Sequence, residues 1–408
     1  MNTFRLRAAC KDDGFTLVEL LIALVLSAVA LAAATSLFGQ LYAQFKRESR
    51  VAQTDIGSAL GLEYLRKDIQ SAGYGLPWAF PSTGMNPYNE YAGSSTTPSG
   101  ANDSLTNPPR AIVPVAGPLL GVLGDYLVIK SVSAAVNETA AGKSIPLQFG
   151  IVPPTAWTPT AANCQYDPEN PCPTDNVIVL SYPQSATGTS TTPTLVAPGG
   201  AFSTTYNNPP GSLNNYTPPT AGTTYMVYDV ADVTNAPAPT GLRMPFNRAD
   251  YFVAPGGQIA ADPPCPAVNI PFPARCAPNT GELVKGVLRH GTSASGVPAG
   301  CFDYYPLLDC VEQMNVNFQL ASGNYASAAV VNQCGGTLPC DASWIRQNVR
   351  EVRVFIVAQE GQKDPSYTSP AITVDPIAPI TFAPPANQLN FRWKVYTIVE
   401  KPYNLGAQ

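Results

Sequence analysis

The sequence predicts an α+β protein in which a long N-terminal helix, membrane-spanning in its first half, packs on an antiparallel β-sheet head with long loops and disulfides. Three observations lead to this fold class: a long apolar run near the N-terminus, later runs that alternate apolar and polar residues, and nine cysteines. Because 45% of the 408 residues are hydrophobic, the chain can bury a core, which excludes wholesale disorder.

The composition excludes several classes of function. Charged residues make up only 12% of the chain, against about 25% in an ordinary soluble domain, and 42 prolines indicate many loops. The formal net charge is −5 and no block of Lys or Arg occurs, so we expect no nucleic-acid partner. His290 is the only histidine, which leaves little for metal binding or acid–base catalysis near neutral pH. We therefore expect no catalytic residues, no enzyme activity, and no metal or other cofactor.

The apolar run extends from Phe15 to Phe38 and reads FTLVELLIALVLSAVALAAATSLF, with Glu19 as its only charge. As a helix it is long enough to cross a hydrocarbon core of about 30 Å. A secretory signal cleaved near residues 28–34 and a plain signal anchor are the ordinary alternatives. Neither explains Glu19, because an acidic side chain in an apolar span is costly and usually functional. Cleavage after Gly14 would place the new α-amine of Phe15 about one helical turn from Glu19.

Residues 14–21, GFTLVELL, resemble the prepilin processing signal of type IV pilins and type II secretion pseudopilins. In those families a membrane peptidase cuts after the glycine and methylates the new N-terminal residue. The resemblance implies that residues 1–14 are a leader removed after Gly14, and that Phe15 becomes N-methylated. It also implies a role for Glu19 in filament assembly, where it pairs with the amine of a neighbouring subunit.

Residues 15–38 are expected to form the transmembrane and filament-core helix, and residues 39–75 to continue it into the head as an amphipathic helix. Apolar residues recur in the second segment at steps suited to one helix face: Leu41, Tyr42, Phe45, Ile56, Leu60, Tyr64, Leu65 and Ile69. Gly73, Gly75 and Pro77 end the helix. The stretch LRKDIQSAGYG at residues 65–75 resembles the end of the long helix in PilW-type minor pilins.

Residues 76–408 are predicted to form a β-rich pilin head with Pro/Thr-rich insertions at about 77–300. Strand-like runs of an antiparallel sheet occupy residues 126–132, 176–182, 224–230, 311–320, 349–358 and 389–399. Residues 307–314 and 396–404 resemble the corresponding parts of PilW-type pilins.

The cysteines predict a disulfide framework. Cys10 would leave with the leader, and the remaining eight form an even set in an exported head. Eight cysteines allow 105 connectivities. Because each adjacent couple encloses a short loop, we expect nearest-neighbour pairing: Cys164–Cys172, Cys265–Cys276, Cys301–Cys310 and Cys334–Cys340.

A metal site is the weaker interpretation of these cysteines, because no C-x-x-C occurs and His290 stands alone. Asp167, Glu169 and Asp175 surround Cys172 and could hold a calcium ion, but a hydrated acidic loop is favoured.

The resemblance implies a minor pilin of a type IV pilus, without catalysis, that takes part in pilus assembly or initiation at or near the tip. Its expected partners are other major and minor pilins, the prepilin peptidase, the inner-membrane assembly platform and a tip adhesin. The chain would lie in the inner membrane with its head in the periplasm, and in the extracellular pilus after assembly. A pseudopilin of a type II secretion system and an adhesin-type pilin are the alternatives. A membrane-anchored periplasmic enzyme is disfavoured, because the sequence offers no nucleophile elbow and no metal pair.

Overall fold

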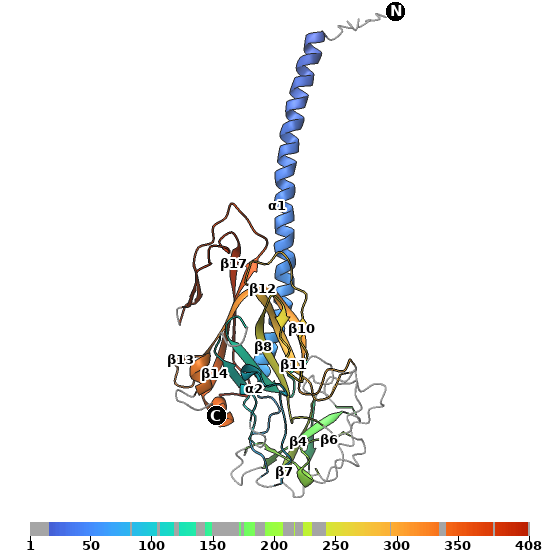
Figure 1. Ribbon diagram of the computed structural model, residues 1–408, viewed down its shortest axis with the longest axis vertical. Helices are drawn as coiled ribbons and strands as arrows, with labels where there is room; N and C mark the ends of the chain where they lie inside the picture. Colours follow the sequence, from blue (N-terminus) through green and yellow to red (C-terminus); the bar gives the residue numbers. More distant parts are fainter. Residues whose placement is uncertain are drawn as a thin grey trace, which may run out of the picture. The chain divides into compact units, whose positions relative to one another are not determined.

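In the computed structural model, the chain forms one long helix and a β-rich head (Figure 1). It describes residues 16–81, 84–103, 107–117, 122–135, 143–148, 171–172, 175–183, 192–206, 216, 223–230, 242–293, 295–333, 340–377 and 380–406; for residues 39–40 and 43–59 it describes the backbone alone. The chain divides into two compact units, Met1–Asp55 and Ile56–Gln408.

Helix α1 (Leu17–Ser71) is continuous over 55 residues. Within the second unit, its buried residues follow helical spacing: Gly61, Leu65, Asp68 and Ile69. Leu60 and Tyr64 were expected on the packed face but are 66% and 53% exposed. The buried stripe therefore lies one position away from them, and it includes a glycine and an aspartate that a search for apolar spacing alone passes over.

The larger sheet of the head is antiparallel, with strand order β1-β2-β8-β11-β12-β14-β17, and β13 pairs with β12. Its strands are β1 (Ile112–Val115), β2 (Tyr126–Ser131), β8 (Asn247–Pro255), β11 (Gly281–Leu288), β12 (Phe302–Leu320), β13 (Tyr325–Ser327), β14 (Val349–Glu360) and β17 (Arg392–Glu400). Alternate residues of β8 enter different apolar clusters: Tyr251 and Val253 pack with Leu65 of α1, whereas Phe252 and Ala254 pack elsewhere. One face of this sheet therefore packs on α1, as the fold class predicts.

A second antiparallel sheet has the order β3-β7-β4-β5, with β6 beside β4, and its labelled strands lie together at one end of the head (Figure 1). It consists of β3 (Ser144–Gln148), β4 (Asn176–Pro183), β5 (Thr194–Leu195), β6 (Thr204–Thr205) and β7 (Thr223–Asp229). Two small hairpins pair β9 (Gln258–Ile259) with β10 (Val268–Asn269), and β15 (Ile372–Asp375) with β16 (Ile380–Phe382). The short helices are α2 (Thr96–Gly100), η3 (Pro198–Gly200), α3 (Ala328–Gln333) and α4 (Ala342–Asn348).

Strands β8 and β11 lie at the centre of the larger sheet, inside the stretch expected to consist of Pro/Thr-rich insertions. The sequence prediction missed both, because each carries buried charged residues that interrupt the apolar pattern. Arg248 and Asp250 of β8 are fully buried, and Lys285 of β11 is 1% exposed. The stretch 77–300 is thus part of the scaffold and supplies β1, β2, β8 and β11.

Two of the four predicted disulfides are wrong. Cys265 pairs with Cys301 and Cys276 with Cys310, instead of Cys265–Cys276 and Cys301–Cys310. Cys301 directly precedes β12 and Cys310 lies within it, so the intervening residues form an extended strand of about 30 Å that cannot close as a loop.

The pairing of β11 with β12 explains which cysteines meet. Their register sets Gly281 opposite Val311 at one end and Leu288 opposite Phe302 at the other. Cys276, which precedes β11, therefore reaches Cys310, while Cys265 reaches Cys301 at the opposite end. Cys172 and Cys340 each take part in a disulfide as well. Their predicted partners, Cys164 and Cys334 respectively, lie outside the described residues.

Candidate processing and assembly segment

The N-terminus of α1 is closed by a reciprocal cap between Thr16 and Glu19. The Glu19 carboxylate accepts hydrogen bonds from the Thr16 backbone N–H and hydroxyl, both at 3.0 Å, and the Thr16 hydroxyl accepts one from the Glu19 backbone N–H at 3.3 Å. This is a capping box, in which a Thr at the N-cap and a Glu three residues later satisfy free helix-end donors. The sequence prediction gave Glu19 a partner in the α-amine of Phe15 and missed this local role. Gly14 and Phe15 lie outside the described residues.

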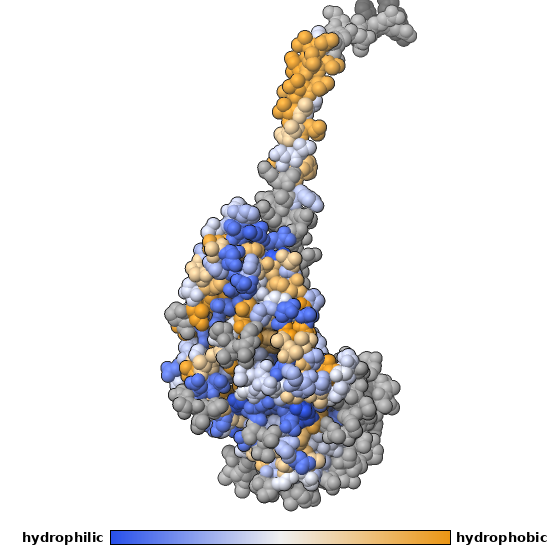
Figure 2. Space-filling model, viewed as in Figure 1, coloured by the Kyte–Doolittle hydropathy of each residue, from blue (hydrophilic) through white to orange (hydrophobic). Residues whose placement is uncertain are grey.

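The first half of α1 is apolar around its whole circumference. Leu17–Phe38 has a mean hydropathy of 2.6 and none of it is buried in the protein, and Figure 2 shows apolar side chains over the visible face of this part of the helix. A helix that is apolar on all sides and unburied needs an apolar environment supplied by lipid or by other helices. The segment is therefore consistent with membrane anchoring.

The C-terminal part of α1 is fixed to the larger sheet by a buried ion pair. The Asp68 carboxylate lies 2.7 Å from Nζ of Lys285 on β11 and accepts a 2.6 Å hydrogen bond from the hydroxyl of Tyr251 on β8. All three residues are nearly inaccessible to water. Asp68 is the acidic residue of the LRKDIQSAGYG stretch, and it joins the helix to the two strands at the centre of the sheet.

The glycines after α1 turn the chain into the head. Gly73 and Gly75 have φ angles of +83° and +68°, which residues other than glycine rarely adopt. Tyr74, between them, donates or accepts a 3.2 Å hydrogen bond with Ser144 of β3 and packs edge-on against Tyr228 of β7. The glycines follow the helix as expected, but α1 ends at Ser71 and not at residue 75, and Tyr74 contacts the smaller sheet.

A cluster of buried charges that the sequence did not predict ties the segment before β1 to β2 and β8. Lys130 of β2 and Arg248 of β8 lie 2.8 Å and 3.0 Å from Glu90. Lys130 also pairs with Asp103, which in turn lies 2.5 Å from Arg110. Although burial raises the pKa of Asp103, the Lys130 and Arg110 charges hold it below the usual value. The only signal in the sequence is the presence of isolated charges inside otherwise apolar runs.

The remaining candidate residues have structural surroundings where they are described. The Asp175 carboxylate accepts a 2.6 Å hydrogen bond from the Cys172 backbone N–H, and Asp167 and Glu169 lie outside the described residues. Nε2 of His290 lies 3.0 Å from Oδ1 of Asn247. Burial, and secondarily the Arg243 charge, lower the pKa of His290 to about 3, so this imidazole is neutral near pH 7.

Comparison with known proteins identifies one feature. Residues 10–35 match the prokaryotic N-terminal methylation motif, which covers Gly14, Phe15 and Glu19. No curated protein and no solved structure matches the chain. The motif indicates a type IV pilin-like or pseudopilin protein, and it suggests interaction with other pilins and with a prepilin peptidase.

Proposed function

We propose that the chain is a PilW-type minor pilin of a type IV pilus that takes part in pilus assembly or initiation at or near the tip. The methylation motif at residues 10–35 carries the proposal, because it joins a cleavable leader and Glu19 to an unburied apolar helix that continues into a head. A head of more than 300 residues supports a tip or low-abundance position, since so bulky a head is hard to repeat along a packed fibre.

The proposed role is non-catalytic, and the chain needs no cofactor for it. The buried state of His290 supports this view, because burial lowers its pKa to about 3 and so weak a base takes up few protons near pH 7. The head would lie in the periplasm before assembly and outside the cell afterwards. That placement is supported by the disulfides Cys265–Cys301 and Cys276–Cys310, which are typical of exported domains.

Processing can be tested on the mature protein. Mass spectrometry of the N-terminal peptide should find N-methylated Phe15 as the first residue. An N-terminus after Ala30 or Ala34 would identify an ordinary secretory signal and overturn the proposal.

Filament entry tests the role of Glu19. We expect Glu19→Leu to insert into the membrane normally and to lose at least about tenfold of its incorporation into sheared filaments, since its carboxylate would no longer pair with an amine. Thr16→Val is the matched control, because it removes the capping hydroxyl and leaves the carboxylate, at a cost of about 1 kcal/mol in helix stability. Equal loss in both variants would show that Glu19 acts only as a helix cap.

A pseudopilin of a type II secretion system is the second candidate, since it would share the same motif. Deleting the gene distinguishes the two. Loss of surface pili with normal protein secretion supports the pilus role, whereas normal pili with impaired secretion supports the pseudopilin role.

A further inference from the structure

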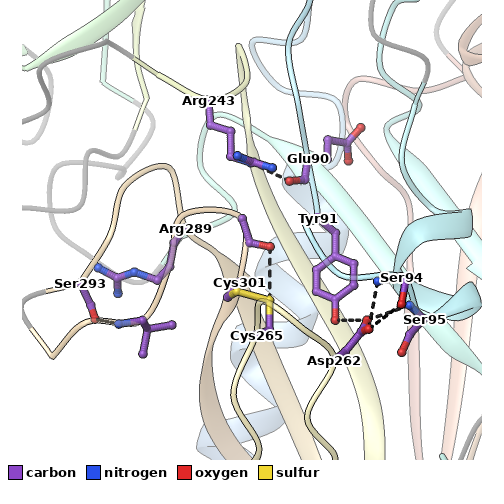
Figure 3. The surroundings of a disulfide bond; sticks show 12 residues. Glu90, Tyr91, Ser94, Ser95, Arg243, Asp262, Cys265, Arg289, Ser293 and Cys301 are labelled. Atoms are coloured by element: carbon purple, nitrogen blue, oxygen red, sulfur yellow. Dashed lines mark hydrogen bonds between the residues drawn. A yellow bond between two sulfur atoms is a disulfide. The ribbon is translucent and has the colours of Figure 1, made fainter.

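The head contains a cavity of about 410 Å³ on the sheet face that does not pack on α1. Tyr126 of β2, Phe252 of β8 and Tyr304 of β12 line it from the sheet, while α2 and the β9–β10 hairpin lie across it. The Cys265–Cys301 disulfide fixes the loop between β9 and β10 to the start of β12, beside Tyr91 and Asp262 (Figure 3). Cavities of this size are typical of sites for small molecules.

Five aromatic residues line the cavity, and they contact one another. Tyr126 stacks on Phe252 with centroids 5.2 Å apart, and Tyr91 stacks on Phe302 at 5.1 Å. Tyr304 contacts both pairs, at 6.1 Å from Phe252 and 5.8 Å from Phe302. Rings that hold one another in place are rigid, so a ligand that packs on them immobilises few side chains. The walls therefore favour a ligand with a broad apolar face.

Four residues with uncharged polar side chains also line the cavity: Ser95, Thr97, Gln258 and Asn269. Gln258 and Asn269 are direct cross-strand partners in the β9–β10 hairpin, so their side chains project from the same face of the hairpin, and both are exposed. Thr97 is 3% exposed, and its hydroxyl has no hydrogen-bond partner among the described residues. A buried hydroxyl without a partner costs free energy, and Thr97 is one of the lining residues, so a ligand hydroxyl that reached it from the cavity would satisfy it.

The charged group of the cavity is already used. Asp262 accepts hydrogen bonds from the Tyr91 hydroxyl at 2.7 Å, the Ser95 N–H at 2.7 Å, and the N–H and hydroxyl of Ser94 at 2.9 Å and 3.0 Å (Figure 3). With four donors on one carboxylate, little capacity remains for a cationic ligand. No Lys or Arg is among the described residues that line the cavity, so nothing there attracts an anion.

We propose that this cavity binds a neutral pyranose sugar, as a monosaccharide or as one terminal unit of a glycan. A pyranose presents an apolar face of C–H groups to aromatic rings, and its equatorial hydroxyls both donate to and accept from amides. This matches the rigid aromatic walls, the paired Gln258 and Asn269 amides, and the unpartnered hydroxyl of Thr97. The inference does not depend on the assembly role proposed above, because it concerns the head alone.

Saturation-transfer NMR and calorimetry on the full-length chain test the ligand class. The chain should be held in a polyoxyethylene detergent, since glucoside and maltoside detergents are themselves sugars. Galactose, N-acetylglucosamine, lactose and chitobiose are the neutral probes, with choline as the cationic probe and N-acetylneuraminic acid as the anionic one. We expect binding of at least one neutral sugar and of neither charged probe. Binding of choline or N-acetylneuraminic acid alone, or of no probe, overturns the proposal.

Three variants locate the site. Combined Gln258→Ala and Asn269→Ala should weaken sugar binding at least about tenfold, as expected for two lost hydrogen bonds. Gln347→Ala, at an exposed glutamine on α4, is the matched control and should leave affinity unchanged. Thr97→Val should weaken binding without lowering the melting temperature, because it removes a hydroxyl that is unpartnered in the free protein. Unchanged affinity in the double variant, or equal loss in Gln347→Ala, would exclude this cavity as the site.

Discussion

At the scale of single residues, the head is held to its helix by charges that lie inside the core. Asp68, Lys285 and Tyr251 form one such group, and Glu90, Lys130 and Arg248 form another. A buried ion pair adds little net stability compared with an apolar pair, but removing one partner leaves an uncompensated buried charge. Single substitutions in these groups should therefore be severe.

Asp68→Ala should destabilise the head by about 3–5 kcal/mol, because Lys285 would keep its charge without a buried partner. Denaturant unfolding of the full-length chain, followed by near-UV circular dichroism, would measure the change. Lys67→Ala, at the exposed neighbouring position, should change stability by less than about 0.5 kcal/mol. Similar losses in the two variants would show that the ion pair does not anchor the helix.

Glu282 on β11 provides a test of pH dependence. Burial, and then the Asp309 charge, raise the pKa of Glu282 to about 8, well above the 4.5 expected when the chain is unfolded. The folded state therefore binds more protons between these values, and the contribution of Glu282 to stability, complete below pH 4.5, is lost as the pH rises through about 8.

Glu282→Gln should remove this dependence, so that the variant gains about 1–3 kcal/mol over the wild type between pH 5 and pH 9. Urea unfolding at a series of pH values would measure it, with Glu63→Gln, exposed on α1, as the control. A constant difference between variant and wild type across this range would show that Glu282 titrates normally.

At the scale of elements, the sequence predicted those whose apolar pattern is uninterrupted. The six predicted strands correspond to β2, β4, β7, β12, β14 and β17, and the glycines at 73 and 75 directly follow the end of α1 at Ser71. Strands β8 and β11 were missed because Arg248, Asp250 and Lys285 look like surface residues until their partners, distant in sequence, are known. The capping box was also missed. Its sequence pattern is present at Thr16 and Glu19, but Glu19 was predicted to pair with an N-terminal amine instead.

Gly61 has an element-scale role that helix propensity does not explain. A Cβ there would lie 2.2 Å from the carbonyl oxygen of Leu307 on β12, so only glycine allows α1 to approach the strand this closely. Gly61→Ala should therefore destabilise the head by at least about 1–3 kcal/mol, even though alanine favours a helix by about 1 kcal/mol.

Gly100→Ala is a matched control for that substitution, since a Cβ at Gly100 meets nothing within 4 Å. Thermal unfolding of the two variants in parallel would separate the close approach from the general effect of replacing glycine. A more stable Gly61→Ala variant would contradict the packing of α1 on β12.

At the scale of the whole molecule, the N-terminal motif and the helix-on-sheet architecture could be predicted, whereas the disulfide connectivity could not. The even number of cysteines in an exported head predicts that they form disulfides, because this argument needs only their number and the compartment. Which cysteines pair depends on the register of β11 against β12, and that register is set by contacts between residues far apart in the chain. The residues lining the sugar-binding cavity could not be predicted for the same reason, because they come from α2, five strands and several loops.

The observed disulfides should hold the β9–β10 hairpin and the loop before β11 to β12. Non-reducing peptide mapping should recover Cys265 linked to Cys301 and Cys276 linked to Cys310, and recovery of Cys265–Cys276 would restore the nearest-neighbour pairing. Each bond closes a long loop, with sequence separations of 36 and 34 residues, so loss of either should cost about 2–4 kcal/mol.

Only the paired substitution Cys265→Ser with Cys301→Ser should also weaken sugar binding, because Cys265 lines the cavity and Cys276 and Cys310 do not. Equal effects of both paired substitutions on sugar affinity, at a temperature where both variants remain folded, would show that the Cys265–Cys301 disulfide has no specific role at the cavity.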